Sequence, residues 1–416
     1  MNIHTFNAFR SRNYRLFFTG QSVSLIGTWM QKTAVSWVVY SLTHSQLMLG
    51  LTLFASLFPS FLFSSVGGVV ADRYNRYRLL LITQVASLVQ ALALTLLVYF
   101  RFYPVEGILV LSAVLGVINA FDVPARQSLV YEMVDDKNDL PNALALNSSM
   151  VNLSRLIGPA LSGIIIQQFG EDICFGLNTL SFVAVIGSLL LMRLPKGRTT
   201  AKHGRIAQEL KEGIRYIRQT PAIGSVLLQM ALLSLLVLPF MTLIPVYAKD
   251  IFKGSASTFG MIDSFIGLGA LSGALLLASL RTGPDLRRML GYSTVLFGIG
   301  LVLFSHTTIY GLSLGFAALA GFGMMAQATI SNTLIQTQVA PDMRGRVISI
   351  YAMLFFGMQP LGGLIIGFLS QYIGTPDTVL LEGIAALLSG SFYFYWLHKQ
   401  KETAVLPVTR ESRGKN

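Results

Sequence analysis

Twelve continuous apolar stretches, each of roughly 20 residues, divide this 416-residue chain. A helix of that length crosses the roughly 30 Å hydrocarbon core of a bilayer. The stretches do not alternate at every second residue, so helices are favoured over a membrane barrel. With 53% hydrophobic and 12% charged residues, the chain cannot coat a soluble globule of this size. We therefore predict an all-α membrane protein with transmembrane helices at 16–40, 47–71, 79–100, 105–128, 142–168, 173–193, 222–247, 257–280, 289–305, 309–332, 347–370 and 377–397.

The basic residues collect on one side of these predicted helices. The opposite side has only Arg101, Lys249 and Lys253. By the positive-inside rule, the basic face and both termini are expected to be cytoplasmic. The net charge of +12 follows from this asymmetry, and the basic residues are split among short loops without a nucleic-acid-binding motif. The basic face holds Arg10, Arg12, Arg15, Arg73, Arg76, Arg78, Arg126, Lys137, Arg281, Arg287, Arg288, Arg344, Arg346, the connector 193–218 and the tail from Lys399.

The largest polar break divides the helices six and six. We expect an N-terminal bundle at 1–196, a cytoplasmic linker at 197–220, a C-terminal bundle at 221–398 and a cytoplasmic tail at 399–416. Apolar residues recur at helical spacing in the linker, which predicts an amphipathic helix on the membrane surface, serving either as a structural linker or as a regulatory site. These residues are Ile206, Leu210, Ile214 and Ile217.

A glycine pair hints that the two halves are duplicates. Gly163 and Gly170 end the fifth apolar stretch, and Gly367 and Gly374 end the eleventh with the same spacing. This agrees with an internal duplication of six helices about a central site.

Residues of the kinds used in metal, cofactor and ATP sites are sparse. Cys174 is the single cysteine, and the five histidines are scattered without ligand spacing. No Gly-Lys-Ser or Gly-Lys-Thr phosphate loop is present. We expect neither a bound metal nor a cofactor, and no enzyme site.

One polar loop carries a family resemblance. The segment Gly68-Val-Val-Ala-Asp72-Arg73-Tyr-Asn-Arg76 resembles the loop between the second and third helices of major facilitator superfamily transporters, in which two pseudo-symmetric six-helix bundles enclose the transport path. The resemblance implies that Asp72 latches the cytoplasmic side, by pairing with the positive end of a second-half helix or with Arg76. The other interpretation is a solvated charge run.

Two further groups extend this resemblance. Asp122 and Arg126 end the fourth helix near the same loop and are assigned to the latch, with a proton-carrying Asp122 as the alternative. Gly158-Pro159-Ala-Leu-Ser-Gly163 is similar to the Gly-Pro motif of antiporting members. Such a segment can bend and pack closely where the halves meet, although it also fits a packing helix without bearing on transport direction.

Motifs across most of the chain resemble the branch that contains the enterobactin exporter, macrolide efflux proteins and lysophospholipid transporters. They are Arg12-Asn-Tyr-Arg15, Gly27-Thr-Trp29-Met-Gln31, Leu42-Thr43, Pro124-Ala-Arg126 and Arg344-Gly345-Arg346.

Charges inside helices are costly and mark functional candidates. Lys32 and Asp263 lie at similar predicted depths, roughly 12 Å and 9 Å from the outer ends of their helices. We hypothesise that they pair or share a water-filled cavity, with Asp263 exchanging a proton as Lys32 approaches and departs. A fixed ion pair, or Lys32 reaching to the outer surface, would be the structural alternatives.

Arg155 is expected near mid-depth in the fifth helix. It either attracts an anionic substrate or packs against backbone carbonyls or Asn152. Glu106 and Glu382 lie near outer helix ends and are expected to be solvated.

These features together predict a secondary transporter of a bacterial inner membrane. We expect it to act as a monomer among membrane lipids, exporting a small amphipathic molecule, such as a siderophore or drug-like compound, by alternating access and proton antiport. A lysophospholipid transporter or flippase is the alternative function, and a polytopic membrane enzyme or a scaffold is the more remote one.

Overall fold

The computed structural model describes residues 4–101, 105–193, 206–279 and 285–405, and the regular secondary structure within these ranges is helical. The first half comprises α1 (Arg12–Thr43), α2 (Gln46–Arg73), α3 (Arg76–Tyr99), α4 (Val105–Met133), α5 (Leu140–Phe169) and α6 (Glu171–Leu190), with the short helices η1 (His4–Arg10) and η2 (Lys137–Asp139). The helix α7 (Ile206–Gln219) follows. The second half comprises α8 (Pro221–Leu236), η3 (Leu238–Leu243), α9 (Ile244–Val246), η4 (Tyr247–Ile251), α10 (Ala256–Ser279), α11 (Leu286–Ser305), α12 (Tyr310–Gln338), α13 (Arg344–Ile373) and α14 (Thr375–Val405).

All twelve predicted spans fall on helical segments. Within the described residues, eleven segments are long and apolar enough to cross a membrane, and α1 is the twelfth by its length of 32 residues. Polar residues lower the hydropathy of α1, yet Gln21, Ser24 and Gln31 are buried against other helices. The polar residues of α1 therefore serve packing inside the protein, and the prediction of an all-α membrane fold is confirmed.

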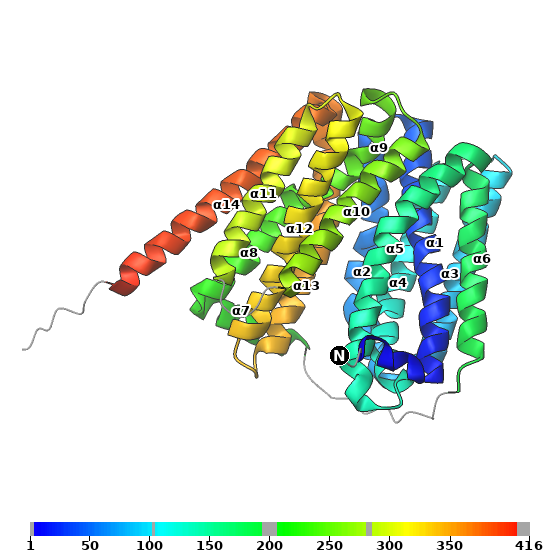
Figure 1. The fold of residues 1–416 in the computed structure, drawn as a ribbon, viewed down its shortest axis with the longest axis horizontal. Coiled ribbons are helices and arrows are strands. Elements are labelled where there is room, and N and C mark those ends of the chain that lie inside the picture. Colours follow the sequence, from blue (N-terminus) through cyan, green and yellow to red (C-terminus); the bar gives the residue numbers. More distant parts are fainter. Residues whose placement is uncertain (1–3, 102–104, 194–205, 280–284, 406–416) are drawn as a thin grey trace, which may run out of the picture.

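The helices form two bundles that lie side by side (Figure 1). The two crossings between them repeat one another. Gly163 of α5 packs on the carbonyl of Ala256, the first residue of α10, and Gly367 of α13 packs on the carbonyl of Gln46, the first residue of α2. Gly170 and Gly374 then end α5 and α13 with φ of 95° and 88°, a conformation that favours glycine. Glycines at the same helix contacts and helix ends in both halves agree with an internal duplication.

The seventh span, predicted at 222–247, is helical but irregular in its second part. It is broken into α8, η3, α9 and the π-helical η4. Pro239 and Pro245 lie in the broken part and cannot donate the backbone hydrogen bonds of a regular helix. The predicted span is nevertheless present, because Pro221–Ile251 forms one apolar segment long enough to cross a membrane.

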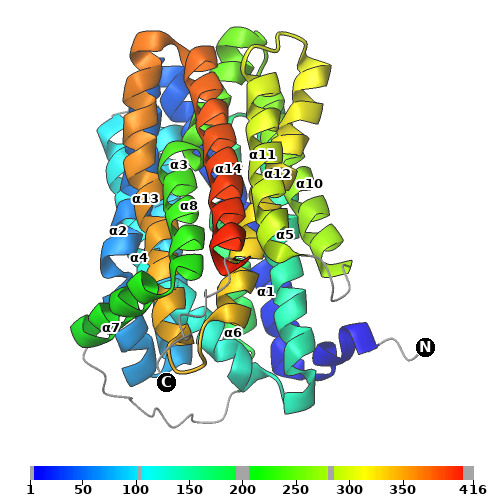
Figure 2. The same ribbon diagram turned by 90° about the vertical axis from the view of Figure 1, so that its left-hand side faces the viewer.

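The linker helix α7 lies across one end of the second bundle, beside α8 and α13 (Figure 2). Arg346 of α13 pairs with Glu212 of α7 at 3.0 Å, and the Tyr216 hydroxyl accepts a hydrogen bond from the backbone of Ala340. These contacts favour the structural interpretation of the linker. Residues 194–205, which include the first part of the linker, lie outside the described residues, as do Arg281 and residues 406–416 of the tail. The domain boundaries that depend on them stay a prediction.

The two ends of the molecule differ in how closely the bundles meet. We call the end that carries η1, the α2–α3 turn and α7 the basic end, and the end that carries the α1–α2 turn the opposite end. Along α5 and α10, the close glycine contacts run from Gly163 to Gly267, all in the half of the helices nearer the opposite end. Those of α2 and α13 run from Gln46, at the opposite end, to Phe61, just past the middle of α2. At the basic end, residues 62–66 of α2 are exposed, so the space between the bundles is open there.

Candidate functional site

Lys32, Arg155 and Asp263 come together between the bundles. They are placed by three helices, α1, α5 and α10. Both Lys32 and Arg155 lie close enough to Asp263 to act on its charge, and Thr33 donates a hydrogen bond of 3.5 Å to the Asp263 carboxylate. The predicted proximity of Lys32 and Asp263 is present in the structure. Arg155 lies beside them as well, although the sequence did not predict its proximity to either residue.

The indole ring of Trp29 is a platform for both cations. The Lys32 ammonium lies 4.7 Å from the ring centroid and the Arg155 guanidinium carbon lies 5.8 Å from it. Such cation–π contacts hold a positive charge without neutralising it. With one carboxylate and two cations, the group carries a formal charge of +1. We call Trp29, Lys32, Arg155 and Asp263 the central cluster.

The rotation of α1 is fixed by a buried amide chain. Gln31 donates to Gln90 of α3 at 3.2 Å and accepts from Asn178 of α6 at 2.7 Å. Because Gln31 points into the first bundle, its neighbour Lys32 turns toward the second. Lys32 is exposed although it lies far from both ends of α1, so it borders the open space between the bundles.

The geometry differs from the structural alternatives that the sequence left open for Lys32, Asp263 and Arg155. Among the described residues, no ion pair of 4.0 Å or less joins Asp263 to Lys32 or Arg155. The Lys32 ammonium lies over Trp29, one turn back toward the basic end, rather than extending to the opposite end. Arg155 makes no hydrogen bond to Asn152, which donates to Ser148 instead, and its closest polar contact is the sulfur of Met241 at 3.9 Å. Neither a fixed ion pair nor a fully bonded packing arginine is present.

The Gly-Pro motif of α5 lies directly beside this cluster. A Cβ at Gly158 would stand 2.5 Å from the Cβ of Trp29, so only glycine lets α5 approach α1 there. The Pro159 carbonyl meets Gly260 of α10, where a Cβ would stand 2.2 Å from its oxygen. The motif is therefore the point at which α5 touches both α1 and α10. Its bearing on transport direction stays a prediction.

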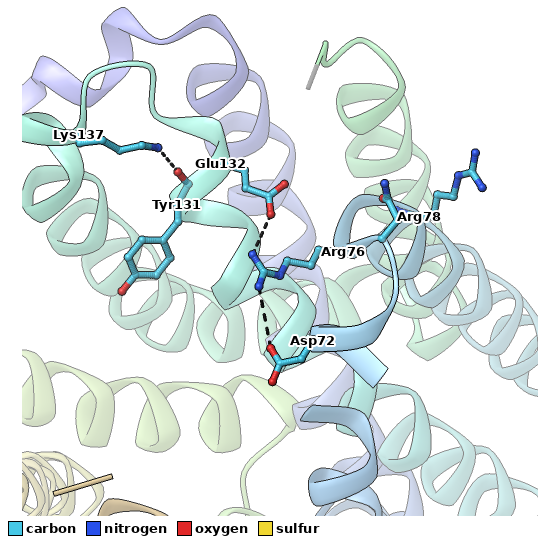
Figure 3. A network of polar contacts seen from close by, with 7 residues as sticks. Asp72, Arg76, Arg78, Tyr131, Glu132 and Lys137 are labelled. Carbon is cyan, nitrogen blue, oxygen red and sulfur yellow. Dashed lines mark hydrogen bonds and ion pairs between the residues drawn. The ribbon is translucent and has the colours of Figure 1, made fainter. Parts of the chain in front are cut away.

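The loop at the end of α2 forms a polar network that stays within the first bundle (Figure 3). Arg76 lies 4.0 Å from the Asp72 carboxylate and bonds Glu132 of α4 at 2.9 Å. Arg73 is exposed, and nothing lies within 4 Å of a Cβ built on Gly68. Of the two partners predicted for Asp72, the structure shows Arg76 and not a second-half helix.

Asp122 and Arg126 form a second, separate network. Their ion pair measures 3.3 Å, and the same carboxylate accepts hydrogen bonds from Thr83 at 2.9 Å and Gln84 at 2.7 Å. This pair binds α3 to α4 inside the first bundle and does not reach the Asp72 group. Its assignment to the latch stays a prediction.

Three features were missed by reasoning from the sequence. Glu132 completes the Arg76 network, and its position ten residues after Asp122, at the same end of the helix, was the available signal.

At the opposite end, Tyr40 of α1 donates a hydrogen bond to Asp250 of η4, and the Lys249 ammonium lies 5.6 Å from the centroid of the Trp37 ring. Glu106 is exposed as predicted, but Glu382 is buried at 1% exposure, because its face of α14 packs on α11.

With this geometry established, comparison with known proteins identifies the family. Residues 3–411 match the MFS_3 family, described as transmembrane secretion effector. The chain belongs to this family. Because the match spans nearly the whole chain, the predicted resemblance to the major facilitator superfamily is confirmed, and the protein is a transporter rather than an enzyme.

Individual relatives agree with the predicted branch. The staphyloferrin A transporter of Staphylococcus aureus is 27% identical, with 91% of this chain and 95% of that protein covered. Macrolide efflux protein A of Streptococcus pyogenes is 23% identical, with 89% and 93% covered. The enterobactin exporter EntS of Shigella flexneri is 24% identical, with 91% and 90% covered.

A solved structure of similar fold is the bacterial homologue of the human lysosomal transporter Spinster, in an inward-facing, unoccupied conformation. It has a TM-score of 0.75 at 12% identity and covers 95% of this chain and 98% of that one. At this identity the likeness shows the fold, two bundles of a multi-pass membrane transporter.

Proposed function

We propose that this MFS_3 transporter exports a small amphipathic molecule, a siderophore or a drug-like compound, from a bacterial cytoplasm by proton antiport. The observation that carries the proposal is the central cluster, which sets two cations and a carboxylate around one indole ring at the open space between the bundles. The named relatives support export of this class of compound. In this account the basic end is the cytoplasmic end and the latch closes it.

The cluster suits a substrate with both an anionic group and a hydrogen-bond donor. A guanidinium matches a carboxylate or phosphate group in charge and shape, which assigns the anionic group to Arg155. The Asp263 carboxylate can accept a donor from the same molecule. The ring of Trp29 and the neighbouring apolar residues contact the apolar part of the substrate.

Antiport requires the substrate and the proton to compete. A substrate that donates a hydrogen bond to Asp263 competes with a proton for the same carboxylate, so each displaces the other. An anion that touched only Lys32 and Arg155 would behave in the opposite way, because protonation of Asp263 would strengthen its binding. The sign of the pH dependence therefore separates antiport from co-transport.

The pH dependence of substrate affinity can be measured directly. Substrate affinity in detergent or nanodiscs is expected to rise with pH as Asp263 loses its proton, and Asp263→Asn should remove this dependence while the protein still inserts. Binding of staphyloferrin A, enterobactin and a macrolide at several pH values, followed by uptake into proteoliposomes under an imposed pH gradient, measures both. Affinity that falls with rising pH, or a dependence unchanged in Asp263→Asn, would contradict antiport at this residue.

A lysophospholipid is the second candidate substrate. Its phosphate fits the same cation pair, and the ring of Trp29 with the neighbouring apolar residues could receive its acyl chain. The same liposome assay with a labelled lysophospholipid decides between the candidates. Movement of that lipid without movement of the siderophores would favour the flippase.

A further inference from the structure

Glu382 is a buried acid that the proposed transport path does not use. It lies on α14, is 1% exposed, and neither carboxylate oxygen has a hydrogen-bond partner among the described residues. Close glycine packing surrounds it: a Cβ at Gly383 would stand 2.8 Å from the Val302 side chain, and one at Gly298 would stand 2.8 Å from the Gly383 carbonyl. Water is therefore excluded from this part of the α11–α14 contact.

Among the described residues of the elements packed on it, no cation lies beside Glu382. The packed elements α8 and η3 contain no Lys, Arg or His, and the arginines of α11 and α13 lie at the basic ends of those helices. The titratable groups that face this region are Tyr247 of η4, His306 at the end of α11 and Asp377 in the first turn of α14. His306 and Asp377 are both exposed and contact each other at 3.1 Å.

The burial of Glu382 favours the protonated, neutral form of its carboxyl group. An ionised carboxylate without a partner costs several kcal/mol in a low-dielectric interior, more than a neutral acid in the same place. We propose that Glu382 is a proton-binding site of the second bundle, separate from the central cluster, and that its occupancy favours the closed opposite end. The proposal goes beyond the function of Asp263 and does not depend on it.

The link to the opposite end runs through helix segment η4. Tyr247, within electrostatic reach of Glu382, begins η4 and donates a hydrogen bond of 2.8 Å to the carbonyl of Ser305. Three residues further, Asp250 accepts the hydrogen bond from Tyr40 of the first bundle. A charge on Glu382 would draw water into this packing and loosen η4, and with it the contact that joins the two bundles.

The exposed acid nearest to Glu382 along α14 lies toward the opposite end. Asp377 lies five residues before Glu382 on α14, roughly 7.5 Å along the helix, and is exposed beside His306. His306 in turn bonds the Ser305 hydroxyl at 3.2 Å, next to the carbonyl that Tyr247 holds. The site would thus respond to the pH at the opposite end.

Infrared spectroscopy of the protein in nanodiscs tests proton occupancy directly. We expect the carbonyl band of a protonated carboxylic acid at neutral pH in the wild type, the same band in Glu106→Gln, a matched control at an exposed helix end, and a weaker band in Glu382→Gln, in which any contribution from Asp263 remains. A band of unchanged intensity in Glu382→Gln, or no such band in the wild type, would overturn the proposal. Glu382→Leu offers a second variant, because removing an unpartnered acid from an apolar site should leave the fold intact.

A distance measurement tests the conformational effect without any substrate. Spin labels at Gln168 and Thr308, exposed residues of the two bundles at the opposite end, are introduced after Cys174→Ala. The wild-type distance should lengthen as pH rises, whereas Glu382→Gln should hold the short distance at every pH. An identical response in both proteins would overturn the effect on closure. Either failure leaves the pH dependence of substrate binding at Asp263 untouched, so the two proposals can fail separately.

Discussion

At the scale of single residues, Arg155 is the side chain best placed to bind an anionic substrate. It shares Trp29 with Lys32 and lies near Asp263, yet no carboxylate in the described part of the chain lies within ion-pair distance of it. A permanently charged guanidinium held over a ring, with its donors not taken up by carbonyls, is arranged to receive a ligand.

Arg155→Gln should therefore discriminate between substrates. Affinity for anionic substrates is expected to fall by at least about tenfold, the value of one charge-assisted hydrogen bond of about 1.5 kcal/mol, while neutral substrates lose little. Equilibrium binding of matched anionic and neutral compounds measures the difference, and Arg155→Lys, which keeps the charge, is the control. Equal losses for both classes would argue against charge recognition.

Residues also mark the limit of what could be predicted from the sequence. The depths of Lys32 and Asp263 along their helices predicted their proximity, because depth follows from residue count. The rotation of each helix does not, since it is fixed by contacts such as Gln31 with Asn178. For that reason Arg155 was left out of the cluster and Glu382 was wrongly expected to be solvated.

At the scale of elements, the crossings of α5 with α10 and of α2 with α13 hold the opposite end closed. Both depend on backbone contacts that only glycine permits, at Gly163 and Gly260 in the first crossing and at Gly50 and Gly367 in the second. The Gly-Pro and glycine-pair patterns were visible in the sequence. The partners of these glycines were not, because they come from the other bundle.

Gly260→Ala should push these elements apart. Its Cβ would stand 2.2 Å from the Pro159 carbonyl, a backbone atom that cannot move alone. Overpacking of this kind costs about 1–3 kcal/mol, so the population open at the opposite end should rise by roughly 5-fold or more. Gly311→Ala, also near the opposite end but with nothing within 4 Å, is the control. Accessibility of a cysteine placed between the bundles measures the shift, and equal accessibility in both variants would contradict the assigned role of the crossing.

At the scale of the whole molecule, the structure has one end closed and the other open. The bundles touch through glycine crossings and the Tyr40–Asp250 hydrogen bond at the opposite end, while the Asp72 network stays within the first bundle at the basic end. The twelve spans and the duplication were predicted from apolar length and from glycine spacing. Which end is open was not, because one sequence encodes both conformations of an alternating-access transporter.

The most direct test of this account is a pair of distances measured in the same lipid bilayer. One pair of spin labels, at Gln168 and Thr308, reports the opposite end, and another, at Asn138 and Thr337, reports the basic end, all four residues being exposed. When a transported substrate or a change of pH shifts the conformation, the account predicts that one distance lengthens as the other shortens. Two distances that stay fixed, or that change in the same direction, would contradict the rocking of two bundles about the central cluster.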